Sequence, residues 1–126
     1  MVSGAYIGSD MQSSSEQAFT SKVLKYQFMG QESQESLSAI NGMNTQVSLF
    51  RNPSEQHYWI TRSDILQPTE GAFSTMTYQT DQQSAAIAYQ GQDYRTMAFG
   101  FPLECIENTE LRRSIMNAAL QFLLTK

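Results

Sequence analysis

Two carboxylates of this chain follow segments that we predict to be strands, and they are the best candidates for acid–base chemistry. Asp10 comes soon after a turn bracketed by Gly4 and Gly8. Glu104 follows the last strand that the sequence predicts. Since ligands of open α/β sheets bind at the carboxyl ends of the strands, we expect both side chains to lie at that edge. They could act there as acid and base, or hold the hydroxyl groups of a sugar.

A structural role for these carboxylates is the alternative, and we favour it because structural ion pairs resemble active sites. Asp10 could cap nearby backbone amides, and the neighbouring Ser9 is equally ambiguous. Glu104 could pair with Arg112 or Arg113, which lie early in a predicted helix where the dipole does not favour positive charge. Asp10 and Glu104 are therefore candidates, and no catalytic residue is assigned.

The chain contains one cysteine, Cys105, and one histidine, His57. A cysteine and a histidine can form a nucleophile and its base. We favour a buried structural thiol and a surface histidine instead, since free cysteines are usually inert core residues. A single cysteine excludes an internal disulfide, and the two residues are too few for a structural zinc site. We predict no metal.

The composition excludes several classes of function. The chain has 126 residues, the size of a single domain, and 40% of them are hydrophobic. Its formal charge of −4 leaves no basic surface for nucleic acid. No apolar run approaches the roughly 18 residues of a membrane span, and the glycines form no dinucleotide fingerprint. We therefore predict a soluble chain with neither a membrane span nor a bound cofactor.

The first part of the chain predicts a helix followed by a long connection. Ser13 and Glu16 form a capping-box pattern with apolar residues at helical spacing behind it, which indicates a helix over 13–26. The segment 27–46 is rich in Ser, Gln and Asn, and we interpret it as a solvated loop.

Apolar runs bounded by turn residues predict the strands that follow. A turn is expected from Gln67-Pro68 to Gly71, and Asp64 is expected to cap the turn ahead of Pro68. The predicted strands are 47–51, 58–62, 73–78, 85–90 and 94–101. The last two are separated by Gly91-Gln92-Asp93 and predict an antiparallel hairpin.

The end of the chain predicts a helix that packs on a sheet. The helix is expected to begin at Asn108 or Thr109, and its wide apolar stripe indicates burial. Alternate residues of the segment 94–101 would form two faces. One face is large, with Met97, Phe99 and Phe101. The other carries Thr96, Ala98 and Gly100, and is small enough for a helix to approach closely.

Three segments together resemble a known family. They are SGAYIGSD, FGFPLE and ELRRSIMNAALQFLL. In this order they resemble the C-terminal half of class I glutamine amidotransferase-like domains. The similarity is to the non-catalytic variety found in exported proteins described as xanthan lyases or cell-wall amidases. It implies an α/β fold with a partial doubly wound, flavodoxin-like sheet, a C-terminal antiparallel hairpin and a closing helix.

The residues that do chemistry in that family are missing here. The family places a nucleophile in the turn G-x-Nu-x-G, and Gly4 to Gly8 fits this pattern with Tyr6 in the place of the cysteine. A phenol with a pKa near 10 cannot replace a thiolate. The family's Phe-His-Pro-Glu-like segment corresponds to Phe101-Pro102-Leu103-Glu104, so Glu104 remains and the histidine is absent. The resemblance thus implies the fold without the amidotransferase reaction.

The resemblance also implies a biological setting. It suggests a non-catalytic accessory or interaction domain of a protein that acts on polysaccharide or cell wall, with ligands near Tyr6, Ser9, Asp10 and Glu104. The alternative is a polysaccharide lyase or hydrolase that uses the carboxylates at the sheet edge. Residues 1–126 would form the C-terminal portion of a larger domain. The exposed sheet edge would then be covered by a preceding segment or by a second copy. Extracellular or periplasmic localisation is expected from the same resemblance.

Overall fold

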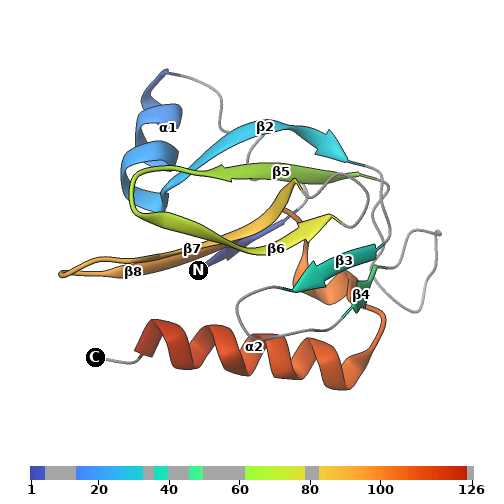
Figure 1. Cartoon of the computed structure of the whole chain (residues 1–126). Helices are drawn as coiled ribbons and strands as arrows, with labels where there is room; N and C mark the ends of the chain where they lie inside the picture. Colours follow the sequence, from blue (N-terminus) through green and yellow to red (C-terminus); the bar gives the residue numbers. More distant parts are fainter. Residues whose placement is uncertain (5–13, 33–35, 40–45, 50–61, 79–82, 125–126) are drawn as a thin grey trace.

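The computed structural model of the chain describes residues 1–4, 14–32, 36–39, 46–49, 62–78 and 83–124. These residues form three layers, with a six-stranded sheet in the middle (Figure 1). The helix α2 (Thr109–Leu124) lies along one face of this sheet. A two-stranded sheet lies over the other face. The predicted combination of a mixed α/β fold with a closing helix is confirmed.

The strands of the central sheet follow the order β1-β8-β7-β6-β3-β4. Strands β1 and β8 run parallel, and the other neighbours are antiparallel. Their bounds are β1 Val2–Ser3, β3 Ser36–Ala39, β4 Gln46–Ser48, β6 Ala72–Tyr78, β7 Ser84–Gln90 and β8 Arg95–Phe99. The smaller sheet pairs β2 (Tyr26–Glu32) with β5 (Ser63–Pro68).

The hairpin of β7 and β8 agrees with the sequence prediction. Gln90 pairs with Arg95, and the Gly91 amide donates to the Tyr94 carbonyl oxygen at 2.9 Å. The predicted strand 73–78 corresponds to β6. The predicted strand 47–51 corresponds in part to β4, and 58–61 lies outside the described residues.

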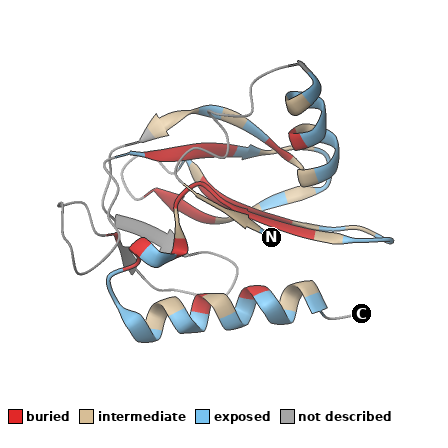
Figure 2. Ribbon diagram, turned by 180° about the vertical axis from the view of Figure 1, so that it is seen from behind, coloured by how far each residue is buried: buried red, intermediate tan, exposed pale blue. Residues whose placement is uncertain are grey.

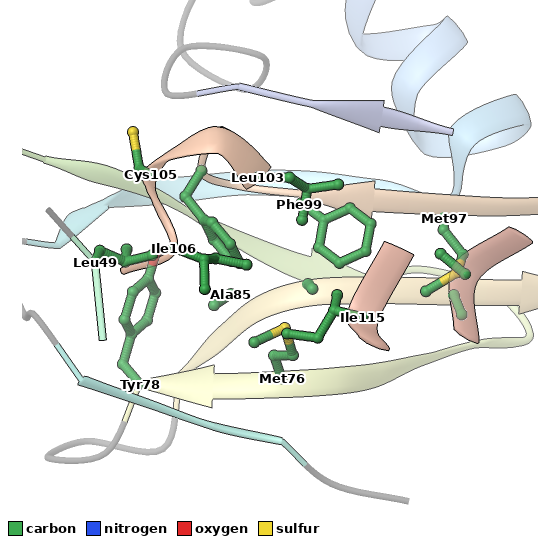
Figure 3. Close-up of a cluster of buried hydrophobic side chains, with 14 of the residues drawn as sticks. Leu49, Met76, Tyr78, Ala85, Met97, Phe99, Leu103, Cys105, Ile106 and Ile115 are labelled. Carbon is green, nitrogen blue, oxygen red and sulfur yellow. The ribbon is translucent and has the colours of Figure 1, made fainter. Parts of the chain in front are cut away.

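Different elements pack on the large and the small face of β8. Met97 and Phe99 belong to the core cluster beneath α2, as the alternation predicts (Figure 3). The expectation that a helix packs on the small face is wrong, because β2 and β5 cover it. Gly100 shows why a strand fits there. Its carbonyl oxygen accepts from the Asp64 amide of β5 at 2.8 Å, and a side chain at this position would overlap the Asp64 carbonyl oxygen.

The first helix is shorter than predicted. Helix α1 spans Ser14–Phe19, and a π-helical turn, η1 (Thr20–Leu24), continues it. Lys25 then adopts a left-handed conformation with φ 70°, and its amide donates to the carbonyl oxygen of Thr20. This cap turns the chain into β2, where Tyr26 is fully buried. Tyr26, the last residue of the predicted helix, thus lies in a strand, where burial between the two sheets stabilises it.

The segment 27–46 contains strands where a loop was predicted. It holds most of β2 and all of β3. The register of β2 against β5 shifts between Phe28 and Gln31, and Gly30 at φ 123° lies within this bulge. Gly30 is therefore a bulge residue, since glycine readily adopts such a conformation.

Strand β5 extends into the segment 67–71, in which a turn was predicted. It runs to Pro68, so the turn itself is confined to Glu70 and Gly71. Proline is tolerated there because it is the last residue of the strand. Asp64 is a buried strand residue, and the prediction that it caps a turn is wrong.

Helix α2 begins where the sequence predicts. The side-chain oxygen of Asn108 accepts from the Leu111 amide at 2.9 Å, as an N-cap residue does. Ile115 and Ala119 are its buried residues. Figure 2 shows that most of the helix is exposed or intermediate in burial. In the described part of the chain no helix is long and apolar enough to cross a membrane.

Candidate functional site

The carboxyl ends of β1 and β8 meet at one edge of the central sheet. Ser3 pairs with Phe99 in parallel register, and the Gly4 amide donates to the Phe99 carbonyl oxygen at 3.3 Å. The segments that follow these two strands therefore start side by side. This is the arrangement in which ligands of α/β sheets are bound.

The structure places one of the four candidate ligand residues. Glu104 lies after β8, and its side chain is exposed. The other three, Tyr6, Ser9 and Asp10, lie outside the described residues. The proximity of Asp10 and Glu104 stays a prediction.

A short buried turn holds Glu104 in place. Glu104 is the middle residue of the 3₁₀-helix η2 (Leu103–Cys105), and both of its neighbours there are buried. The Cys105 amide donates to the Pro102 carbonyl oxygen at 3.0 Å. Figure 3 shows Leu103 and Cys105 among the core side chains. Buried flanking residues and a closed turn fix the backbone from which the exposed carboxylate projects.

The favoured ion pair of Glu104 is not formed. Within the described residues neither Arg112 nor Arg113 makes an ion pair with Glu104 or Glu107. Arg112 donates instead from Nη2 to Thr109 Oγ1 at 3.3 Å. This prediction is wrong because the side chain of Arg112 turns back onto its own helix. The carboxylate of Glu104 remains open to solvent.

The cysteine is a core residue. Cys105 is fully buried, and the pKa of its thiol is raised from 9.0 to about 11. Burial is the main cause of this shift, the negative charge of Glu104 adds to it, and Arg112 opposes it. At neutral pH the thiol is therefore protonated and is a poor nucleophile. The interpretation of Cys105 as a structural thiol is confirmed, while its suggested partner His57 lies outside the described residues.

A buried polar cluster, which the sequence analysis missed, lies between the two sheets. Asp64 is fully buried and accepts from Gln31 Nε2 at 3.3 Å. Tyr78 donates its hydroxyl to the Asp64 backbone carbonyl oxygen at 2.8 Å. The pKa of Tyr26 is raised to about 12, first by burial and second by the negative charge of Asp64. Tyr26, Asp64 and Tyr78 are fully buried, so the cluster joins β5 to the central sheet.

A cavity of about 190 Å³ lies between α2 and the central sheet. Its walls are mostly apolar. They are formed by Phe73, Thr75, Met76, Ala88, Met97, Phe99, Ile115, Ala118, Ala119 and Phe122. The only signal in the sequence was the wide apolar stripe of the last helix, which indicates burial but not whether the space is filled.

In the described part of the chain, no three His, Cys, Asp or Glu side chains are grouped so that they could hold a metal ion.

Comparisons with known proteins identify no relative. The chain matches no protein-family model, and searches of curated proteins and of solved structures found no similar chain. The resemblance to amidotransferase-like domains therefore depends on the three sequence segments alone.

Proposed function

We propose that this chain is a non-catalytic accessory domain with an amidotransferase-like, partly doubly wound fold. In this proposal it binds polysaccharide or cell-wall material at the edge where β1 and β8 end. One observation carries the proposal, the parallel pairing of Ser3 with Phe99. This pairing brings the ends of β1 and β8 together at one edge of the sheet, and the segment that carries Glu104 follows β8 there.

The chemistry of the available nucleophiles supports a non-catalytic role. Cys105 is the only cysteine, and its pKa is raised to about 11. The place of the family's nucleophile is taken by Tyr6. A buried protonated thiol and a phenol are both unsuited to attack an amide at neutral pH.

Glu104 is suited to binding a sugar. Its carboxylate is exposed and makes no ion pair with the arginines of α2. An ionised carboxylate can accept hydrogen bonds from two neighbouring hydroxyl groups, and such charge-assisted bonds are stronger than neutral ones. The rigid turn η2 would keep the loss of entropy on binding small.

An NMR titration tests this proposal. Backbone amide shifts of the chain are followed as neutral and polyanionic polysaccharides and cell-wall fragments are added. We expect the shifts to be concentrated in residues 100–106, and Glu104→Gln to lower the affinity about tenfold. Glu70→Gln is the matched control, because Glu70 is exposed in the turn between β5 and β6, at the opposite end of the sheet.

The same protein separates the alternatives. Shifts that avoid residues 100–106 with every glycan would contradict the binding proposal. Hydrolysis of glutamine by the chain would contradict its non-catalytic part. Cleavage of a polysaccharide that is lost in Asp10→Asn and in Glu104→Gln would establish the enzymatic alternative instead.

A further inference from the structure

We propose that α1 and η1 together form a lid that opens as one unit about Lys25 while both sheets stay folded. We call this element the strap, and it comprises residues 14–24. It lies at the end of the molecule where β5 turns into β6 (Figure 1). The strap bonds to Tyr94, just before β8, whereas Glu104 follows the other end of that strand. Failure of this inference would therefore leave the proposed sugar site untouched.

Little apolar surface holds the strap in place. Among residues 15–24 only Thr20 is buried. The large apolar side chains of Phe19 and Val23 are 45% and 41% exposed. Leu24, the last residue of the strap, is partly buried against an apolar cluster between the two sheets. This cluster consists of Tyr26, Leu66, Ile87 and Ala98. Since burial of apolar surface is the main source of stability, the strap is a region of low local stability.

Three hydroxyl groups from other parts of the chain hold the end of the strap. The last four carbonyl groups of a helix have no partner within the helix. Each hydroxyl donates to one of these carbonyl oxygens: Thr69 to Ser21 at 2.7 Å, Thr96 to Leu24 at 3.2 Å and Tyr94 to Lys22 at 3.4 Å. When the strap leaves, water can take the place of each partner, so the net stabilisation by these bonds is small.

The strap is also weak in itself. Its six α-helical and five π-helical residues are fewer than an isolated helix needs to be stable in water. The hydroxyl groups of Thr20 and Ser21 both donate to the carbonyl oxygen of Gln17, at 3.1 and 2.8 Å. Such bonds bend a helix and slightly destabilise it, and π-helical turns are rare. We therefore expect the strap to unwind when it detaches.

Lys25 separates the strap from the part of the chain that stays folded. Its left-handed φ of 70° is uncommon for a residue other than glycine. The carbonyl oxygen of Lys25 accepts from the Thr69 amide at 3.0 Å, and the next residue, Tyr26, is fully buried. The chain can thus rotate at Lys25 while β2 keeps its place. Opening exposes the side of the apolar cluster that Leu24 covers.

Hydrogen exchange of the whole chain, measured by NMR, tests this proposal. The probe is the amide of Lys25, which donates to the carbonyl oxygen of Thr20 and is released when the strap unwinds. The slowest amides of β7 and β8 report global unfolding. We expect the Lys25 amide to exchange at least about a hundredfold faster than they do. Equal rates would overturn the proposal.

Three variants separate local opening from global unfolding. Ile115→Ala weakens the core beneath α2, so global exchange should quicken about thirtyfold while the Lys25 amide keeps its rate. Thr69→Val removes a bond of the closed strap and should quicken exchange of the Lys25 amide about fivefold. Tyr89→Phe is the matched control and should change neither rate, since no described residue accepts a hydrogen bond from the Tyr89 hydroxyl.

Two results with these variants contradict a local opening. In one, Ile115→Ala quickens exchange of the Lys25 amide as much as that of the slowest amides. In the other, the Lys25 amide of Thr69→Val exchanges as slowly as in the wild type.

Thiol labelling provides an independent measurement. Thr20→Cys places a thiol at the buried position of the strap, and the native Cys105 lies in the core beneath α2. We expect iodoacetamide to label position 20 at least about a hundredfold faster than Cys105. If both thiols react at one rate, the strap opens only when the whole chain unfolds, and the proposal is wrong.

Discussion

The two faces of the central sheet are covered in different ways. On the face covered by β2 and β5, strand β5 makes a backbone hydrogen bond to Gly100. Small residues of the central sheet, such as Ala98, allow this close approach. Beneath α2 the contacts are made by side chains, including that of Arg95, which donates to the Phe122 carbonyl oxygen at 2.8 Å. The buried residues of the helix are Ile115 and Ala119. A cavity of about 190 Å³ remains there. Small residues and contact between backbones thus give a closely fitted layer, whereas contact through side chains leaves a cavity.

Hydrogen bonds and the cavity distinguish the two faces. On the strand-covered face the carboxylate of Asp64 accepts from Gln31, and Thr96 Oγ1 donates to the Leu24 carbonyl oxygen at 3.2 Å. The hydroxyl groups of Thr75 and Thr77 in β6 are both buried without a partner. Hydrogen bonds therefore join the strand-covered face to its layer, whereas an apolar cavity remains between α2 and the sheet.

Gly100→Ala should have the largest effect on this comparison. The new methyl group would overlap the Asp64 backbone, which cannot move without breaking the contact between the layers. We expect a loss of more than about 4 kcal/mol in the free energy of unfolding, measured by urea denaturation.

Gly91→Ala is the control for Gly100→Ala. Its methyl group would meet only the side chain of Tyr89, whose ring can rotate away. We expect a loss of less than about 1 kcal/mol. Equal losses in the two variants would mean that β5 does not approach the sheet as closely as described.

The second prediction compares one isoleucine on each face. Ile87 is fully buried under β2 and β5, and Ile115 borders the cavity. Truncation to alanine should cost about 4 kcal/mol for Ile87 and about 2 kcal/mol for Ile115, because Ile115 has fewer contacts to lose. Chemical denaturation of both variants measures this difference. A larger loss for Ile115 would contradict the loose packing of the helix-covered face.

The third prediction concerns alkaline pH, at which one buried group on each face of the sheet loses its proton. The pKa of Cys105, beneath α2, is raised to about 11 from 9.0, and that of Tyr26, beneath β2 and β5, to about 12 from 10.0. Both groups lose their protons at lower pH in the unfolded chain. Stability is therefore complete below pH 9 and falls as pH rises toward 12. The upper limit of this loss is about 1.4 kcal/mol for each pH unit and each group.

Single variants assign the two parts of this pH dependence. In Cys105→Ala the loss between pH 9 and 11 should shrink, whereas Tyr26→Phe should remove the part between pH 10 and 12. Urea midpoints measured at half-unit steps separate the two contributions. A wild-type midpoint that stays constant from pH 9 to 12 would show that neither group has a raised pKa.

The smallest expected effect concerns the local stability of α2. Asn108→Ala removes the acceptor for the Leu111 amide and should cost about 1 kcal/mol in thermal denaturation. Asn117→Ala, at an exposed position within the helix, should be neutral or slightly stabilising, since alanine is the better helix former. If both variants melt at the same temperature, Asn108 does not act as a cap.

The parts of the fold that the sequence predicts correctly have local signals. The hairpin is indicated by the turn at Gly91 between two apolar runs, and the start of α2 by Asn108 with an apolar stripe behind it. Each signal lies within a few residues of the element that it forms. Local patterns of this kind suffice for a hairpin and a helix end.

The elements that were missed depend on distant partners. Strand β2 is rich in glutamine and reads as a loop until β5 pairs with it, 31 to 42 residues further along, as the pairs Glu32 with Ser63 and Tyr26 with Pro68 show. Asp64 resembles a turn residue in the sequence. Its burial depends on the distant Gln31, which donates a hydrogen bond to its carboxylate. Of the candidate site, Glu104 was expected at the end of the last strand and lies there, whereas the cavity depends on how α2 packs on distant strands.

The parallel pairing of β1 with β8 has a consequence for the order of folding. It joins Val2 to Ala98, so the chain must close a loop of about a hundred residues before this contact forms. The hairpin of β7 and β8 closes a loop of only a few residues and can form early. We expect the sheet edge that carries the proposed sugar site to be assembled last. In hydrogen exchange, the amide of Gly4 should therefore open well before those of the hairpin.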